Sequence, residues 1–128
     1  WLVKVRVREG GIHPARLGEL CEAMGSNTSA RKLDLDGASI RDGGCGMVAG
    51  MLGRNRHICK LDLQFCAITD AGCEDLCKGI KESKAPLREV NLMQNNISKE
   101  SAGVLAAAMA SHRRCRLILT TEVVREVE

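Results

Sequence analysis

Aromatic residues are almost absent from this 128-residue sequence, which contains one Trp, one Phe and no Tyr. Because stacking side chains are lacking, we do not expect a platform for single-stranded nucleic acid. The formal net charge of +3 is also too small to indicate a nucleic-acid partner. With 45% apolar residues the chain can bury a core. That core must consist of Leu, Ile, Val, Ala, Met and Cys, which suits thin and regular layers.

Long apolar runs and a secretory signal are lacking as well. The longest apolar run, Ala102–Ala110, is about half of the roughly 20 residues that a bilayer crossing needs. We therefore expect a soluble chain without a membrane partner. The seven cysteines are an odd number, whereas a secreted disulfide framework favours an even count. These features predict free thiols in a reducing, cytoplasmic compartment.

The main positive feature is an internal repeat of 28 or 29 residues. Segments 4–24, 32–52, 60–80 and 89–109 align with one another without a gap. Five columns are apolar in all four units: Val5/Leu33/Leu61/Val90, Val7/Leu35/Leu63/Leu92, Ile12/Ile40/Ile68/Ile97, Leu20/Val48/Leu76/Leu105 and Met24/Leu52/Ile80/Met109. No single unit could bury its apolar face alone, so the repeat indicates stacked units.

Two periodicities occur within each unit. The opening L-x-L alternates as in a short half-buried strand, and the later spacing of three or four describes one helix face. Thr69 and Ser98 stand at expected helix N-caps, and Pro14 falls in a first helical turn. The sequence predicts an α/β solenoid with a parallel sheet on the concave side and helices on the convex side. We assign a single domain, 1–128, with repeats at about 2–29, 30–57, 58–86 and 87–113.

The end of the chain departs from the four units. A fifth strand is expected at 117–119, and Val123, Val124 and Val127 of the tail could extend or cap the sheet. Residues 114–128 are therefore assigned to a partial fifth repeat or cap. Neither end shows the polar terminal unit that stacked repeats need. We expect the chain to be a segment of a longer horseshoe with further repeats beside it.

The pattern L-x-L-x-x-[N/C/A/G]-x-I before a helix resembles the leucine-rich repeat. The repeat length, and the succession of Cys66 and Asn95 at the turn after the strand, resemble the ribonuclease-inhibitor class. Gly10 and Ala38 depart from that turn pattern in the first two units. The resemblance covers residues 2–120 and implies a protein-binding scaffold. Relatives of this kind include inhibitor proteins, innate-immune sensor tails, actin pointed-end cappers and Ran GTPase-activating proteins, so the resemblance specifies fold rather than function.

Three thiols in the segment QFCAITDAGCEDLC (64–77) raise the alternative of a metal or redox site. A zinc site needs a second cysteine pair or well-spaced histidines, and neither is evident. Instead, Cys66 occupies the turn column, and Cys73 and Cys77 occupy helix columns that the other units fill with Cys, Leu or Ala. We predict buried packing thiols that react slowly, with no metal and no cofactor. Cys59 and Cys115 flank strands and have no comparable explanation.

No catalytic site is evident in the sequence. The Gly-rich segment 43–53 lacks the lysine of a phosphate-binding loop and lies in a predicted helix. The shared column of Gly18, Gly46 and Gly103 predicts that these glycines allow helices to pack. No nucleophile is linked to a base and an orienting acid, so we predict no enzyme activity. The histidines are expected to be solvated loop residues: His13, His57 and His112.

Strand residues that alternate with L-x-L should form rows on the concave face. In the central units, Lys and Asp rows should neutralise each other and form a charged pattern that discriminates a partner. Phe65, the only Phe, should be exposed near the rim, where Met93 could extend the apolar patch. The alternatives are a merely solvated face and a Phe65 folded over its turn. We predict these partner-binding residues: Lys4, Arg6, Arg8, Lys32, Asp34, Asp36, Lys60, Asp62, Gln64, Phe65, Glu89, Asn91, Met93 and Gln94.

The function predicted from the sequence is non-catalytic binding of another protein through the concave face. Two alternatives remain open at this point. The chain could be a fragment of a GTPase regulator of the Ran GTPase-activating kind, although no arginine with a distinguishing signature supports that role. It could also be an architectural subunit of a large cytoskeletal or ciliary assembly.

Overall fold

Strands and helices alternate along the chain in the computed structural model, which describes residues 3–7, 11–119 and 123–125. The first two units comprise β1 (Val3–Arg6), α1 (Pro14–Ser26), β2 (Ala30–Asp34) and α2 (Arg41–Arg54). The next two comprise β3 (Lys60–Asp62), α3 (Asp70–Glu82), β4 (Glu89–Asn91) and α4 (Lys99–Ala108). A short 3-10 helix η1 (Met109–Ser111), β5 (Arg116–Ile118) and β6 (Val123–Arg125) follow.

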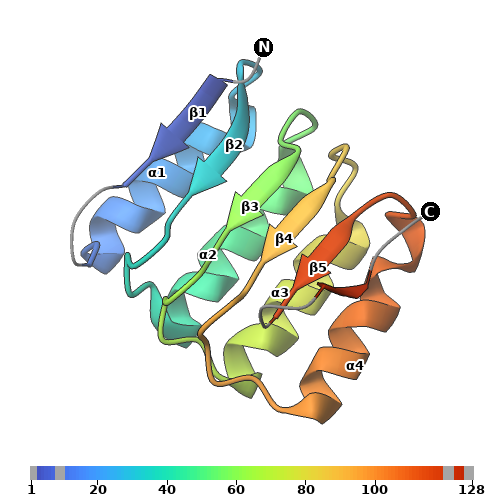
Figure 1. Ribbon diagram of the computed structural model, residues 1–128. Helices are drawn as coiled ribbons and strands as arrows, with labels where there is room; N and C mark the ends of the chain where they lie inside the picture. Colours follow the sequence, from blue (N-terminus) through green and yellow to red (C-terminus); the bar gives the residue numbers. More distant parts are fainter. Residues whose placement is uncertain (1–2, 8–10, 120–122, 126–128) are drawn as a thin grey trace.

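The strands form one six-stranded sheet in the order β1-β2-β3-β4-β5-β6, in which β1 to β5 are parallel. Figure 1 shows the strands side by side, with the helices packed against one face of the sheet. The parallel strands pair in the predicted register, Lys4↔Lys32↔Lys60↔Glu89↔Arg116. β6 contains Val123 and Val124 and pairs antiparallel with β5, so the tail extends the sheet. Val127 lies outside the described residues.

The core lies between the sheet and the helices, and the predicted apolar columns fill it. Fifteen of the twenty column residues are buried, including every member from the second and third units. The other five pack against the core while remaining partly buried: Val5, Val7, Ile12, Leu20 and Ile97. Four of these belong to the first unit, which has a neighbouring unit on one side only among the described residues.

The glycines that allow close helix packing are not those predicted. At Gly18, Gly46 and Gly103 an added Cβ would meet no atom closer than 3.7 Å. At Gly72 and Gly79 an added Cβ would meet atoms of the preceding unit at 2.5 and 2.6 Å. The prediction that Gly18, Gly46 and Gly103 allow helices to pack is therefore wrong. A column shared by several glycines does not by itself show which helix face meets a neighbour.

Aspartates at the start of α2 and α3 bind the start of the following helix. Asp42 accepts hydrogen bonds from the Thr69 N–H (2.7 Å), the Thr69 hydroxyl (2.6 Å) and the Gly72 N–H (3.1 Å). Asp70 likewise accepts from the Ser98 N–H at 2.8 Å. Thr69 is thus at the predicted N-cap, but the capping carboxylate comes from the preceding unit. Each such bond satisfies an N–H that its own helix leaves unpaired.

A second set of polar side chains follows the helices. Asn55 donates to the carbonyl oxygens of Met24 (2.6 Å) and Asn27 (3.2 Å), and it accepts from the N–H groups of His57 and Ile58, both at 2.8 Å. It therefore joins two successive loops. The same column contains three residue types in the four units, so the repeat pattern does not mark its role: Asn27, Asn55, Ser83 and His112.

His112 corrects one further prediction. Its side chain is only 9% exposed, and its Nε2 lies 2.7 Å from the Ile80 carbonyl oxygen. The expectation of a solvated loop histidine is therefore wrong for His112. His13 is exposed and caps α1 by accepting from the Ala15 N–H at 3.2 Å, while His57 is half-buried.

The buried glycines generate a stability prediction. In Gly79→Ala the new Cβ would lie 2.6 Å from the Ala49 Cα, so the backbone must shift and we expect a loss of about 1–3 kcal/mol. The matched control is Gly50→Ala in α2, where an added Cβ meets nothing within 4 Å and helix propensity should add up to about 1 kcal/mol. Urea unfolding of both variants measures the two effects. Equal stabilities would contradict the described packing of α2 and α3.

The pH dependence of Asp42→Ala tests the bonds between units. Burial raises the pKa of Asp42, but hydrogen bonds from Thr69 and Gly72 outweigh it and hold the pKa below the ordinary 3.8. The stabilisation is thus present above that value and is lost as the pH falls through the folded-state pKa. At neutral pH we expect a loss of about 1 kcal/mol, as for other N-caps, shrinking towards zero in acid. A difference that does not change with pH in urea titrations would refute this role.

Candidate functional site

One face of the sheet carries no helix (Figure 1) and is here called the open face. Strand residues that alternate with the buried L-x-L positions belong to this face and form two rows. The first row contains Lys4, Lys32, Lys60, Glu89 and Arg116, and the second contains Arg6, Asp34, Asp62 and Asn91. Consecutive members of each row lie on paired strands, so the sheet register places the predicted rows as expected. Arg8 lies outside the described residues.

The acidic and amide members of the second row also shape the turns after the strands. Asp34 accepts a hydrogen bond from the Asp36 N–H (3.0 Å), and Asp62 accepts from the Gln64 N–H (3.1 Å). Asn91 likewise accepts a hydrogen bond from the Met93 N–H at 3.0 Å. Asp34 and Asn91 are 5% and 9% exposed, so the expectation that both face solvent is wrong. The missed signal was an Asx-type turn, in which Asp or Asn bonds the backbone two residues on.

Cys66 and Asn95, which share the turn column, hold successive turns together. Asn95 accepts from the N–H groups of Cys66 and Ile68, both at 3.0 Å, and donates to the Leu63 carbonyl oxygen at 2.8 Å. The Cys66 thiol donates to the Leu35 carbonyl oxygen at 3.0 Å. These bonds fix the backbone that presents residues 64, 65, 93 and 94 to solvent.

Phe65 is exposed to 62% and has a φ of +51°. Gly37 and Gln94 occupy the same column, with φ of +75° and +60°, so the left-handed conformation belongs to the turn itself. Such a conformation costs an L-residue about 1–2 kcal/mol, and glycine avoids that cost. The predicted exposure of Phe65 is correct, and the alternative in which it folds over the turn is wrong. The fold tolerates this aromatic residue without burying it.

The charges on the open face are unevenly paired. Asp34 lies 3.5 Å from the Lys4 ammonium and 3.6 Å from the Arg6 guanidinium. Among the described residues, neither Asp36 nor Asp62 forms an ion pair. Lys32 and Lys60 likewise form none in the described part of the chain, so the expected side-by-side neutralisation of the central units is not found. Glu89 is paired with Arg116 at 3.7 Å.

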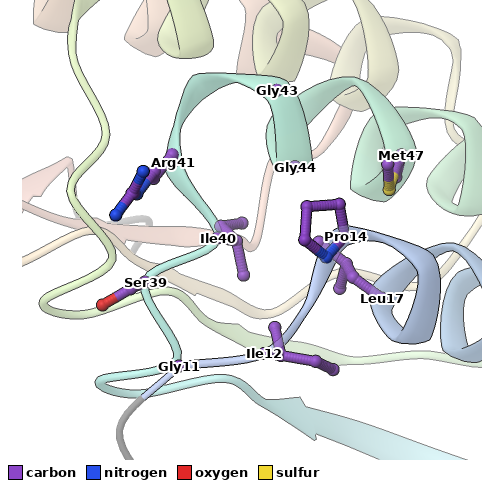
Figure 2. Close-up of a pocket in the computed structure, with 10 residues that line it drawn as sticks. All are labelled: Gly11, Ile12, Pro14, Leu17, Ser39, Ile40, Arg41, Gly43, Gly44 and Met47. Atoms are coloured by element: carbon purple, nitrogen blue, oxygen red, sulfur yellow. The ribbon is translucent and has the colours of Figure 1, made fainter.

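A groove of about 660 Å³ lies between the N-terminal ends of α1 and α2 (Figure 2). Pro14 and Leu17 face Ile40 and Gly44 there, while Arg41 points away. An added Cβ on Gly44 would lie 2.8 Å from the Leu17 side chain. The two helices therefore pack closely against each other at this groove. The described lining contains no buried polar side chain that could orient a ligand. The groove is therefore a helix junction rather than a candidate site.

All seven cysteines are free thiols, and six of them are buried. Burial raises the pKa of Cys21 to about 11 and, as the largest cause, raises those of Cys45 and Cys73 to about 12. Desolvation also raises the pKa of Cys66 and Cys77. Thiols of this kind are almost entirely protonated at neutral pH and are therefore poor nucleophiles.

Within the described residues, no group of three His, Cys, Asp or Glu side chains lies in an arrangement that could hold a metal ion. No helix within 3–7, 11–119 or 123–125 is long and apolar enough to cross a bilayer.

The architecture defines the fold class as an α/β leucine-rich-repeat solenoid, as predicted. A family model described as "Leucine Rich repeat" matches residues 54–77 and 83–106. Among solved structures, one titled "Leiomodin-1 Actin-Binding Site 2 (ABS2)" is similar with a TM-score of 0.76 at 18% identity. The match covers 93% of this chain and 70% of that one. No curated protein matches the chain.

The thiols provide a prediction for this part of the molecule. In native protein at pH 8, a thiol reagent should label the half-buried Cys59 first, because the other six side chains are buried. Addition of denaturant should expose all seven thiols within the same assay. Mass spectrometry after short labelling identifies the modified residue. Rapid native labelling of Cys66, Cys73 or Cys77 would contradict the packing role assigned to them.

Proposed function

We propose that this chain is a non-catalytic protein-interaction module that binds its partner through the open face. The observation that carries the proposal is Phe65, a largely exposed aromatic side chain in a backbone conformation that favours glycine. The turn adopts this conformation with Gly37 or Gln94 in the same column, so folding does not require an aromatic residue there. Exposed aromatics are frequent anchors of protein interfaces. The bonds of Asn95 and Cys66 keep this turn fixed, which lowers the entropy cost of binding.

The same proposal extends to the class of repeat and to the cellular compartment. The 28/29-residue period and the turn bonds of Cys66 and Asn95 support a ribonuclease-inhibitor-like class. Seven free thiols support a reducing, cytoplasmic location. A modest net charge and a scarcity of aromatic residues favour a protein over a nucleic acid as the partner.

Further repeats beside this chain remain a prediction. On the outer flank of α4, Ile97, Ala106 and Leu119 are only partly buried, which would suit a further packed unit. β6, however, occupies the edge of β5 at which another parallel strand would pair. The GTPase-regulating and architectural alternatives have no specific support in the described residues. The actin-binding title of the similar structure makes actin a partner to test, although 18% identity shows only a common fold.

The variant Phe65→Gly tests the proposal. Glycine removes the cost of the left-handed conformation, which stabilises the folded state by about 1–2 kcal/mol. It also adds conformational entropy to the unfolded chain, which destabilises the folded state by about 0.5–1 kcal/mol. We therefore expect unchanged or slightly higher stability in urea unfolding. Partner binding should weaken by about 30-fold if Phe65 is an anchor worth about 2 kcal/mol.

A matched control is Val104→Ala on α4, because Val104 is also 62% exposed and lies on the helical side of the molecule. Proteins captured from extract by wild type and by Val104→Ala, but not by Phe65→Gly, are the expected partners, and purified actin is assayed beside them. Identical capture by all three chains would refute open-face binding. A destabilisation of Phe65→Gly beyond about 1 kcal/mol would instead indicate a structural role.

A further inference from the structure

On the open face, positive and negative side chains lie at different positions along the strands. Lys32, in the middle of β2, pairs with Lys60 at the start of β3, while Asp62 ends β3 and Asp36 lies two residues after the end of β2. Two residues along a strand advance the chain by roughly 6–7 Å, so Lys60 and Asp62 belong to distinct positive and negative zones. A partner that covers this face meets a basic edge and an acidic edge in a fixed orientation.

Asp36 and Asp62, the two carboxylates of the acidic edge, form no ion pair within the described chain. Lys4 and Arg6 both lie against Asp34. Asp62 accepts two hydrogen bonds from the Gln64 side-chain amide, at 3.0 and 3.1 Å, which orient the carboxylate without neutralising it. Partial desolvation, followed by the charges of Asp62 and Asp34, raises the pKa of Asp36, and the opposing charge of Arg6 offsets only part of this rise.

Backbone hydrogen bonds place Phe65 at this acidic edge. The Gly37 N–H donates to the Gln64 carbonyl oxygen at 2.9 Å, so the turn that contains Asp36 lies against the turn that contains Phe65. The Phe65 N–H in turn donates to the Met93 carbonyl oxygen at 3.1 Å. Phe65 is exposed and Met93 is half-buried. The acidic edge therefore combines two carboxylates with an aromatic side chain and a thioether on three consecutive turns.

We propose that this edge binds an arginine-bearing segment of the partner protein. A guanidinium group is planar, pairs with a carboxylate through two N–H groups and stacks on an aromatic face, whereas a lysine ammonium is a point charge. Asp36, Asp62 and Phe65 supply the two kinds of contact that a guanidinium uses. This inference rests on the proposed function, because it names the chemistry of the segment that the open face takes.

The probe is a displayed library of random twelve-residue peptides, selected on the full chain with counter-selection on Phe65→Gly. Enriched peptides should contain arginine beside an apolar residue. Replacing that arginine by lysine should weaken binding by about threefold or more. In the chain, Asp36→Asn with Asp62→Asn should weaken binding by about tenfold. Asn91 shows that asparagine in this column still caps its turn, so Asp62→Asn should fold normally. Urea unfolding of each variant verifies this.

Two control variants separate the acidic edge from general charge. Glu74→Gln removes an exposed acid on α3 and should leave peptide binding unchanged. Lys32→Gln with Lys60→Gln removes the basic edge and should not weaken an arginine peptide. Peptides that depend on Phe65 but are acidic, or that tolerate both aspartate substitutions, would overturn the arginine proposal and leave open-face binding intact. Peptides that ignore Phe65→Gly, or a selection without any retained peptide, would overturn both.

Discussion

The structure depends on side chains of one unit that satisfy the backbone of a neighbouring unit. Asn95 binds N–H and carbonyl groups of the preceding turn, Asp42 binds the start of α3, and Asn55 joins two loops after the helices. A unit of 28 residues cannot bury an apolar face or complete its loop hydrogen bonds alone. These bonds fix the spacing of the units, and the spacing in turn brings the sheet rows and the apolar columns into register.

Once the register is fixed, some turn positions are not needed to hold the fold together. At the turns after β2, β3 and β4, Asp34, Asp62 and Asn91 cap the backbone, and Cys66 and Asn95 bind the neighbouring turn. Between them lies a residue with a left-handed backbone, which the core does not contact. Glycine would suit this position, and it is present as Gly37 in the preceding unit. An aromatic side chain at Phe65 is thus a departure that folding does not explain, which directs attention to binding.

Much of the fold followed from the apolar periodicity, because burial on one face of a strand or helix imposes a strict pattern. The turn positions of Cys66 and Asn95 followed from the resemblance to the leucine-rich repeat, and the exposure of Phe65 followed from its column, which is polar or Gly in the other units. Polar contacts between units were less predictable. His112 occupies a column with Asn27, Asn55 and Ser83, and no single residue type marks that shared role. Asp34 and Asn91 look like surface residues in sequence, yet the turns they cap bury them. Glycine packing at Gly79 depends on the approach of two helices, which a column alone does not reveal.

Open-face binding is most directly tested by amide hydrogen exchange of the chain with and without a captured partner. The account predicts slower exchange in the partner complex at the turns after β2, β3 and β4, around Asp36, Phe65 and Gln94. The exposed surfaces of α1 to α4 should exchange as in the free chain. Protection confined to the helices, with unchanged exchange at these three turns, would contradict the account.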